Sequence, residues 1–131
     1  TMDDMLRTWT LIHWEKPWTV NAERTWHFQK RAKHVRAARE AFRALALAED
    51  LPTVPAITVA AVPLAKDRRG IQDVAACLPM VKAAVDGIVD AGIIPDDDPQ
   101  HMRALTFYPT EVVGRSGLRL IITETIKGAT R

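Results

Sequence analysis

The segment "PMVKAAVDGIVDAGIIPDDDPQHM" (residues 79–102) decides the fold, because a helical pattern ends inside it and a strand pattern follows it. Its apolar side chains recur at spacings of four and three, as one face of a helix requires. They are Val81, Val85 and Ile88. Pro79 suits a first helical turn, and Gly92 is typical of the residue that follows a last turn. The segment therefore predicts a helix over residues 79–91.

The other side of this predicted helix is charged. Lys82, Asp86 and Asp90 lie four residues apart and share a face. The simplest interpretation of Lys82 is an ion pair with Asp86, worth about 0.3 kcal/mol. The functional interpretation is a cation that stabilises negative charge on a phosphate.

Three consecutive carboxylates, Asp96, Asp97 and Asp98, follow between two prolines. Adjacent carboxylates repel one another, and a hard cation such as Mg²⁺ relieves the repulsion by taking oxygen ligands. The alternative is a solvated acidic turn, since Asp is common in turns. Asp73 lies in a second polar turn, over residues 66–73. If the two turns emerge at the same edge of a sheet, we expect these carboxylates to converge on a metal ion.

The remaining patterns predict four strands and one further helix. The strands are residues 7–15, 55–65, 101–111 and 117–126, and the helix is residues 27–49. Pro63 is expected to mark the end of the second strand. The last two strands, joined by residues 113–117, are typical of a β-hairpin. The order β-α-β-α-β-β predicts one α+β domain over residues 1–131, with two helices on a small mixed sheet.

Composition excludes several classes of protein. No apolar run reaches the roughly 18 residues that a membrane helix needs, and the N-terminus lacks the pattern of a signal peptide. The single cysteine, Cys77, is unable to form an internal disulfide, which suits a reducing cytoplasm. Beside Leu78 and Pro79 it is expected to be packed rather than reactive. We therefore expect a cytoplasmic protein without a membrane partner.

Basic side chains are concentrated in residues 16–43, which carry eight Lys or Arg against two Glu, although the net charge of the chain is only +2. The predicted helix has an apolar face and a basic one. The apolar face holds Phe28, Val35, Ala38, Phe42 and Leu45, and the basic face holds Lys30, Lys33, Arg36, Arg39 and Arg43. One interpretation is a docked helix with a solvated basic face. The functional interpretations are contact with a phosphate backbone and, as a weaker option, contact with an acidic protein.

Two tryptophans, Trp18 and Trp26, lie in an expected loop over residues 16–26. Tryptophans are by default part of a core or an interface. Since Lys16 and Arg24 flank them, stacking on unpaired bases is the functional alternative.

The order of these signals resembles a known family. The segment "DRRGIQDVAACLPMVKAAVDGIVDAGIIPDDDPQHM" (residues 67–102) is similar to the central region of the RusA-like Holliday junction resolvases, endonucleases of bacteria and phages. That family shows a basic turn ending in Asp-x-Asp-Asn, a lysine, a helix with Asp-Gly or Asp-Ala, then Ala-Gly, an apolar pair and Asp-Asp. The matching positions are Arg68, Arg69, Asp73, Lys82, Asp86, Gly87, Ala91, Gly92, Asp96 and Asp97. The flanks are supportive, through Pro17, Asn21 and Arg24 and through the last predicted strand, so the resemblance covers roughly residues 8–125.

The resemblance implies a homodimer that binds branched DNA in recombination, repair or phage DNA processing. It implies Mg²⁺, for which Mn²⁺ can substitute, and symmetric cutting of a four-way junction. By position, Asp73 and Asp97 match metal-holding aspartates and Lys82 matches a lysine that supports catalysis, while Asp86 and Asp96 are further candidate ligands. The side chains expected to hold DNA are Arg24, Lys30, Lys33, Arg36, Arg39, Arg43, Arg68 and Arg69.

One motif departs from the family pattern, because Asp-x-Asp-Asn reads Asp73-Val74-Ala75-Ala76 here. The change removes one expected oxygen ligand. Three alternatives follow. Another aspartate (Asp86, Asp96 or Asp98) supplies the missing ligand, the metal binds more weakly, or the protein binds branched DNA without cutting it. The first two outcomes are favoured because the other charged motif residues are retained together. Asp98 is alternatively expected to cap the turn into Pro99.

Overall fold

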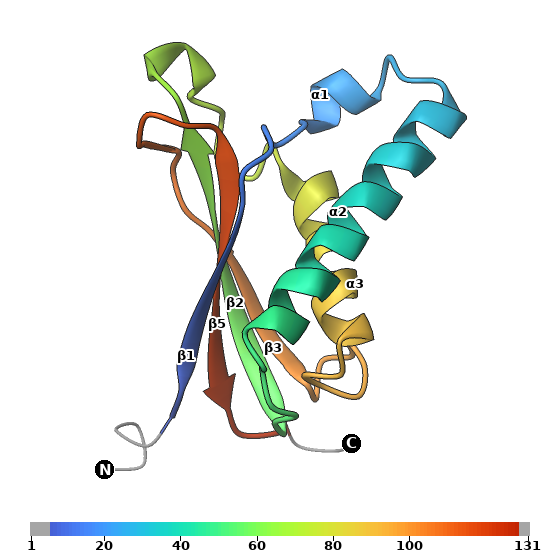
Figure 1. Ribbon diagram of the computed structural model, residues 1–131, viewed down its shortest axis with the longest axis vertical. Helices are drawn as coiled ribbons and strands as arrows, with labels where there is room; N and C mark the ends of the chain where they lie inside the picture. The colour runs from blue at the N-terminus through green and yellow to red at the C-terminus, as the bar shows by residue number, and fades with distance from the viewer. Residues whose placement is uncertain (1–5, 129–131) are drawn as a thin grey trace.

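The computed structural model describes residues 6–128, in which the helices α2 and α3 cover one face of an open sheet (Figure 1). The elements are β1 (Thr8–His13), α1 (Val20–Glu23), α2 (Phe28–Ala48), β2 (Ala56–Ala65), the 3₁₀ turn η2 (Arg68–Gly70), α3 (Leu78–Asp90), β3 (Met102–Phe107), β4 (Glu111–Val112) and β5 (Gly117–Thr125). The strand order is β1-β5-β2-β3, and the short β4 pairs with β2 beyond β3. The predicted α+β class and mixed sheet are confirmed, with α1 and β4 as short additions. None of the described helices is long and apolar enough to cross a membrane.

The predicted hairpin between the last two strands is wrong. β5 lies between β1 and β2 and is antiparallel to both, whereas β3 lies on the far side of β2 and is parallel to it. The reason is burial. β5 carries three fully buried side chains, Leu118, Leu120 and Ile122, and therefore takes a central position, whereas β3 is only partly buried and takes the edge. The chain reaches that edge through α3, in a β2–α3–β3 crossover.

Pro63 does not end β2, which continues to Ala65. The backbone groups of Ile57, Ala61 and Ala65 make hydrogen bonds toward β3 and β4, at 2.8, 3.0 and 2.9 Å. Pro63 belongs to the same alternation and lies opposite the gap between the end of β3 and the start of β4. Its missing N–H therefore costs no ladder hydrogen bond, which explains why a proline is tolerated inside this strand.

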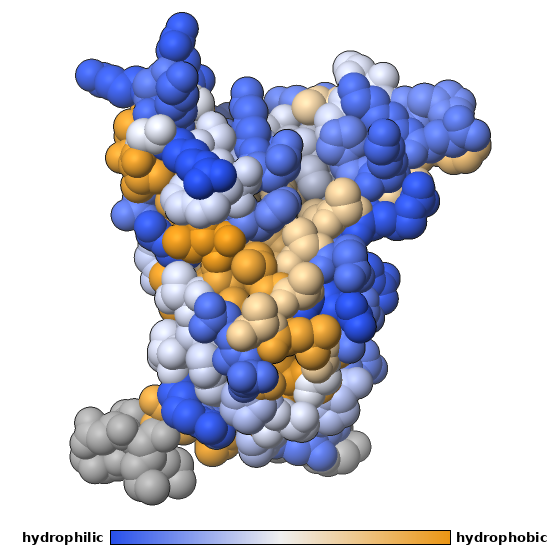
Figure 2. Space-filling view, viewed as in Figure 1, coloured by the Kyte–Doolittle hydropathy of each residue, from blue (hydrophilic) through white to orange (hydrophobic). Residues whose placement is uncertain are grey.

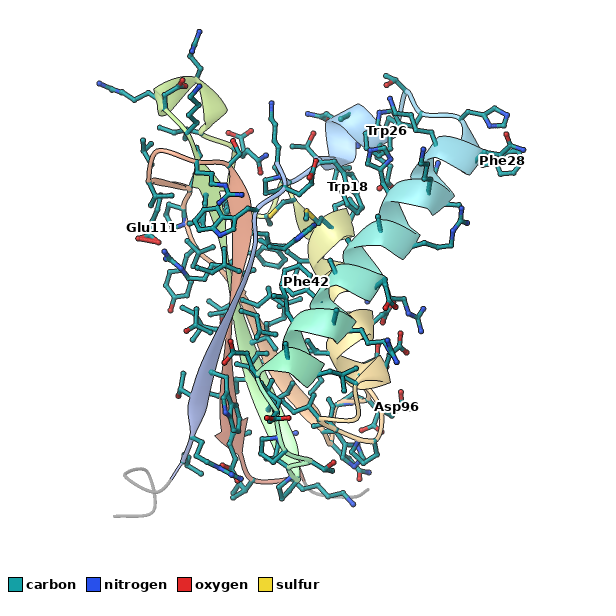
Figure 3. The ribbon with its side chains drawn as sticks, in the orientation of Figure 1. Trp18, Trp26, Phe28, Phe42, Asp96 and Glu111 are labelled. Carbon is teal, nitrogen blue, oxygen red and sulfur yellow. The ribbon has the colours of Figure 1, made fainter. Side chains whose placement is uncertain are left out.

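The two long helices lie close to their predicted bounds. Gly92 ends α3 with a φ of +91°, a left-handed conformation that favours glycine. The core is built from α2, α3 and the inner face of the sheet. Its largest fully buried side chains include Phe42, Met80, Ile88, Leu11 and Ile57. Phe28, expected on the apolar face of α2, is instead 68% exposed because it begins the helix beyond the edge of the sheet (Figure 3).

The opposite face of the sheet carries no helix among the described residues (Figure 1). Its side chains alternate with the core residues and form cross-strand rows. The rows are Thr8–Thr123–Thr58–Ala104, Thr10–Ile121–Ala60–Thr106 and Ile12–Arg119–Val62. We call these residues the outer face.

Candidate active site

A small pocket of about 90 Å³ brings together three charged residues that the sequence singled out. Lys82 and Asp86 come from successive turns of α3, and Asp97 comes from the loop that leads from α3 back to β3. Apolar side chains complete the lining, namely Val85, Met102 and Leu105. The crossover thus folds the acidic loop back against the polar side of α3, and we call this the Lys82 pocket.

The three charged groups in the Lys82 pocket are open to solvent. Lys82 and Asp97 are exposed, and Asp86 is partly buried. In residues 6–128 no ion pair joins Lys82 to Asp86, although their spacing suggested one. The ammonium group and both carboxylates therefore remain able to meet a ligand.

Asp73 lies at the other end of the crossover. It follows η2, beyond the carboxyl end of β2, whereas Asp97 precedes the amino end of β3. Because β2 and β3 are parallel, these ends lie at opposite edges of the sheet. The condition for convergence of Asp73 with the aspartate run is therefore not met, and Asp73 does not line the Lys82 pocket. Across the described part of the chain, no three Asp, Glu, His or Cys side chains are grouped so that they could hold a metal ion.

The aspartate run is organised by hydrogen bonds. The Asp96 carboxylate accepts a hydrogen bond of 2.8 Å from the backbone N–H of Asp97. Asp98 accepts backbone hydrogen bonds from Gln100 (2.9 Å) and His101 (3.3 Å), and its carboxylate lies 2.8 Å from Nδ1 of His101. The prediction that Asp98 caps the turn is confirmed. Its carboxylate is engaged there, so it is not available to replace the missing motif aspartate.

The surroundings of Asp98 keep it ionised. Partial burial raises the pKa of its carboxyl group, but the hydrogen bonds from His101 and Gln100 outweigh this effect and hold the pKa below its ordinary value. A fixed negative charge at Asp98 holds the loop that places Asp97 at the pocket.

Three of the eight basic side chains expected to hold DNA are paired within the chain. Arg39 makes a two-pronged contact with Asp90 on α3, at 2.6 and 2.8 Å, and the resulting hydrogen bonds lower the pKa of the Asp90 carboxyl group. Arg43 pairs with Glu40 at 3.1 Å, and Arg69 pairs with Asp67 at 2.9 Å. These three cations are partly neutralised before any ligand arrives.

The other five cations make no ion pair within the described residues. They are Arg24, Lys30, Lys33, Arg36 and Arg68, and all are exposed. The Lys30 ammonium lies 4.9 Å from the ring centre of Trp26, within the range of a cation–π contact. Figure 2 shows hydrophilic side chains along the outer side of α2 and apolar ones gathered between α2 and β1.

Trp18 and Trp26 are packed within the protein, as the default interpretation predicts, rather than exposed for stacking on unpaired bases. Trp18 is 8% exposed and donates its Nε1–H to Glu23 at 3.0 Å, so it belongs to the core. Trp26 is partly buried, and its ring lies 4.3 Å from that of His34 (Figure 3). Cys77 is also packed, as predicted, and burial raises the pKa of its thiol to about 11.

A wider hollow of about 700 Å³ lies on the outer face, where sequence reasoning expected no site. It is bordered by Tyr108, Pro109 and Thr110, which join β3 to β4, and by Glu111, the first residue of β4. In the sequence, Thr, Ala and Ile alternate with buried residues along β2 and β5, and this alternation indicates a second face of the sheet. It did not locate the hollow, because the strand order determines which of these side chains are neighbours.

The chain therefore presents a charged pocket (Lys82, Asp86 and Asp97), a basic helix face and a neutral sheet face. A scan against models of protein families finds no match for the chain, and a search of curated proteins finds none either.

Proposed function

We propose that this protein is a Mg²⁺-dependent, structure-specific DNA endonuclease that cuts four-way junctions or other branched DNA. The observation that carries the proposal is the meeting of Lys82, Asp86 and Asp97 at one pocket. These residues also belong to the segment that resembles the RusA-like resolvases. A lysine beside two carboxylates is a suitable set for hydrolysis of a phosphodiester.

The donors at the pocket fit a hard divalent cation. Mg²⁺ is usually held by one or two carboxylates, with waters and substrate phosphates completing its shell. Asp86 and Asp97 would hold it, and there it would supply Lewis acidity and offset charge on the scissile phosphate. Lys82 would donate a hydrogen bond to a phosphate oxygen and stabilise the charge that develops on it. Asp73 has no part in this proposal, because it does not line the pocket.

The exposed cations support binding of a polyanion. Lys33 and Arg36 on α2 and Arg68 in η2 make no ion pair among the described residues, so their charge is available to phosphates. We propose that they contact the DNA backbone, with Arg24 and Lys30. Such contacts add affinity without reading sequence, which suits a protein that recognises DNA shape.

A second candidate function is branched-DNA binding without cutting. It is favoured by one observation: the pocket holds only two carboxylates among its lining residues, Asp86 and Asp97. If the metal bound weakly, the protein would still bind a junction through the basic side chains of α2 and η2, but it would not cut the DNA.

Cleavage of a labelled synthetic four-way junction, with Mg²⁺ or Mn²⁺, tests the proposal. We expect paired symmetric nicks from the wild type and a loss of roughly 100-fold or more in Asp97→Asn. Asp73→Asn is the matched control, since it makes the same change at an exposed carboxylate outside the pocket, and it should cut like the wild type. Tight binding without cuts in either metal would favour the second candidate. Equal loss in both variants would show that the pocket is wrongly assigned.

A further inference from the structure

We propose that a hollow beside Trp18 and Trp26 binds a single nucleotide, with the base inside it and the phosphate on lysines at its rim. The hollow measures about 340 Å³, and its lining includes both tryptophans, His34, Lys16 and Gln72. This volume lies at the lower end of the range for small-ligand sites. We call it the Trp18 pocket. It shares no lining residue with the Lys82 pocket, so the two are separate sites.

The wall of the Trp18 pocket is built from packed rings. The ring centres of Trp18 and Trp26 lie 6.1 Å apart, and that of His34 lies 4.3 Å from Trp26. Figure 3 shows both tryptophans where α1 meets the first turns of α2. Trp18 is held by its hydrogen bond to Glu23, and Nδ1 of His34 donates to the carbonyl oxygen of Lys30 at 2.9 Å. A flat heterocycle would therefore pack against a preformed apolar wall.

Gln72 supplies an acceptor that lacks a partner. Its Nε2 donates to the carbonyl oxygen of Pro17 at 2.9 Å, and because a carbonyl only accepts, Oε1 must be the other end of the amide. Oε1 is buried and has no hydrogen-bond partner among the described residues. Buried polar atoms are nearly always paired, so this acceptor suits a ligand that donates a hydrogen bond. The exocyclic amino groups of adenine, cytosine and guanine are such donors.

The acceptor is covered, so a base reaches it only when a side chain of the wall moves aside. Lys16 and Glu15 belong to the wall, and both are exposed. Neither makes an ion pair among the described residues, so either is free to move.

The charges around the Trp18 pocket favour an anionic ligand. A second hollow of about 320 Å³ adjoins the pocket and shares Glu15 with it, and Lys33 lines this second hollow. The two hollows together thus have two exposed lysines, Lys16 and Lys33, against one carboxylate. The Lys30 ammonium, 4.9 Å from the ring centre of Trp26, is a further cation close by. A phosphate would meet cations beside an apolar hollow, as a nucleotide requires, whereas a cationic ligand would be repelled.

Two sources could supply the nucleotide. One is an unpaired nucleotide of branched DNA held by α2, and this source rests on the proposed function. The other is a free nucleotide, which does not depend on it. The chemistry at the pocket is the same in both cases, because base and phosphate are common to both.

The indole N–H signals in proton–nitrogen NMR spectra of the full chain test the proposal. Deoxyadenosine monophosphate is added to about 10 mM, which saturates a site with a dissociation constant of about 1 mM. We expect saturable shifts of the Trp18 and Trp26 signals. The signals of Trp9 and Trp14, which do not line the pocket, should stay in place. Inorganic phosphate at the same concentration should move none of the four.

Variants of the pocket identify the contacts. Gln72→Met should weaken binding of deoxyadenosine monophosphate about 10-fold, because the acceptor is lost. Gln29→Met makes the same change at an exposed position of α2 outside the pocket and should bind like the wild type. Ala22→Phe places a ring in the pocket and should abolish binding, and it decides the matter if Gln72→Met fails to fold. Lys16→Gln should weaken binding of the nucleotide about 3-fold and leave that of deoxyadenosine unchanged, because only the nucleotide carries a phosphate.

A DNA duplex with one bulged nucleotide distinguishes the sources. Shifts of the Trp18 and Trp26 signals with the bulged duplex, but not with a fully paired one, would assign the pocket to unpaired DNA. Shifts with the mononucleotide alone would assign it to a free nucleotide. The absence of shifts in all these titrations overturns the proposal. It is also overturned if folded Gln72→Met and Ala22→Phe bind like the wild type, or if acetyl-arginine amide shifts the signals and no nucleotide does. A chain that binds the nucleotide but cuts no junction leaves this inference standing and removes only the proposed enzyme activity.

Discussion

Gly87 determines how closely the two long helices approach. A Cβ atom built at Gly87 would lie 2.2 Å from the carbonyl oxygen of Arg39 and 3.0 Å from the backbone nitrogen of Arg43. α3 therefore touches the backbone of α2 at this point. The close crossing also brings Asp90, one turn further along α3, within reach of the Arg39 guanidinium.

Gly87→Ala should destabilise the fold by about 1–3 kcal/mol, because the helices must separate to admit the methyl group. Helix propensity alone predicts the opposite sign, a gain of about 1 kcal/mol, since Ala is a better helix former than Gly. Equilibrium unfolding in urea measures the difference between the two proteins. A variant more stable than the wild type would contradict the close crossing.

At the residue scale, the sequence predicted the roles that depend on neighbouring residues, and it did not predict contacts between distant parts of the chain. The roles of Gly92, Asp98 and Cys77 were foreseen because each depends on neighbours in sequence, through a helix end, a turn or a nearby proline. The pairing of Arg39 with Asp90 joins residues 51 positions apart and depends on the helix crossing. The position of Asp73 relative to Asp97 depends on the relative direction of two strands, which no local pattern records.

At the scale of elements, the sequence predicted the long helices and four main strands well and their pairing poorly. Hydrophobic periodicity is local, so it locates α2, α3, β2 and β5. Whether β5 pairs with β3 or inserts between β1 and β2 depends on which arrangement buries more apolar surface, and that is a property of the whole sheet. Pro63 was misjudged for the same reason, since its tolerance depends on the gap between β3 and β4.

α2 offers a matched pair of arginines for testing DNA binding. Arg36 makes no ion pair among the described residues, whereas Arg43 pairs with Glu40. If α2 contacts phosphates, Arg36→Gln should reduce the slope of log K against log salt by about 0.9, the value for one lost phosphate contact. Arg43→Gln should change the slope less, because its charge is already offset. Fluorescence anisotropy with a labelled junction, over a range of salt concentrations, measures both.

Equal slopes for wild type, Arg36→Gln and Arg43→Gln would argue that α2 does not contact the DNA backbone. The same titration addresses the acidic-protein interpretation of this helix. A chain whose affinity for DNA is weak and insensitive to salt would leave that interpretation as the better account of the basic face.

At the scale of the whole molecule, three surfaces of different charge are kept apart. The cations lie along α2, the Lys82 pocket lies between α3 and β3, and the neutral outer face lies on the far side of the sheet. The crossover produces this separation, because it folds one acidic loop back onto α3 while leaving the other side of the sheet uncovered. A polyanion held by the basic helix would thus meet the molecule on the helical side, where the pocket also opens between α3 and the edge strand.

Binding of a cation at the Lys82 pocket should be measurable as stability of the whole chain. A ligand that binds only the folded state stabilises it by linkage, by about 1.4 kcal/mol at ten times its dissociation constant. For a domain of this size we expect Mg²⁺ to raise the melting temperature by about 3–6 °C. Asp86→Asn combined with Asp97→Asn should abolish the shift, since both proposed ligands lose their charge.

The quantity compared is the change in melting temperature on adding Mg²⁺, with NaCl at equal ionic strength as the reference. This reference is needed because relief of carboxylate repulsion alone can raise the melting temperature of the variant. Asp73→Asn should retain the full shift. A shift of equal size in the double variant would place the cation elsewhere on the molecule. A shift lost in Asp73→Asn would mean that this aspartate reaches the metal although it does not line the pocket.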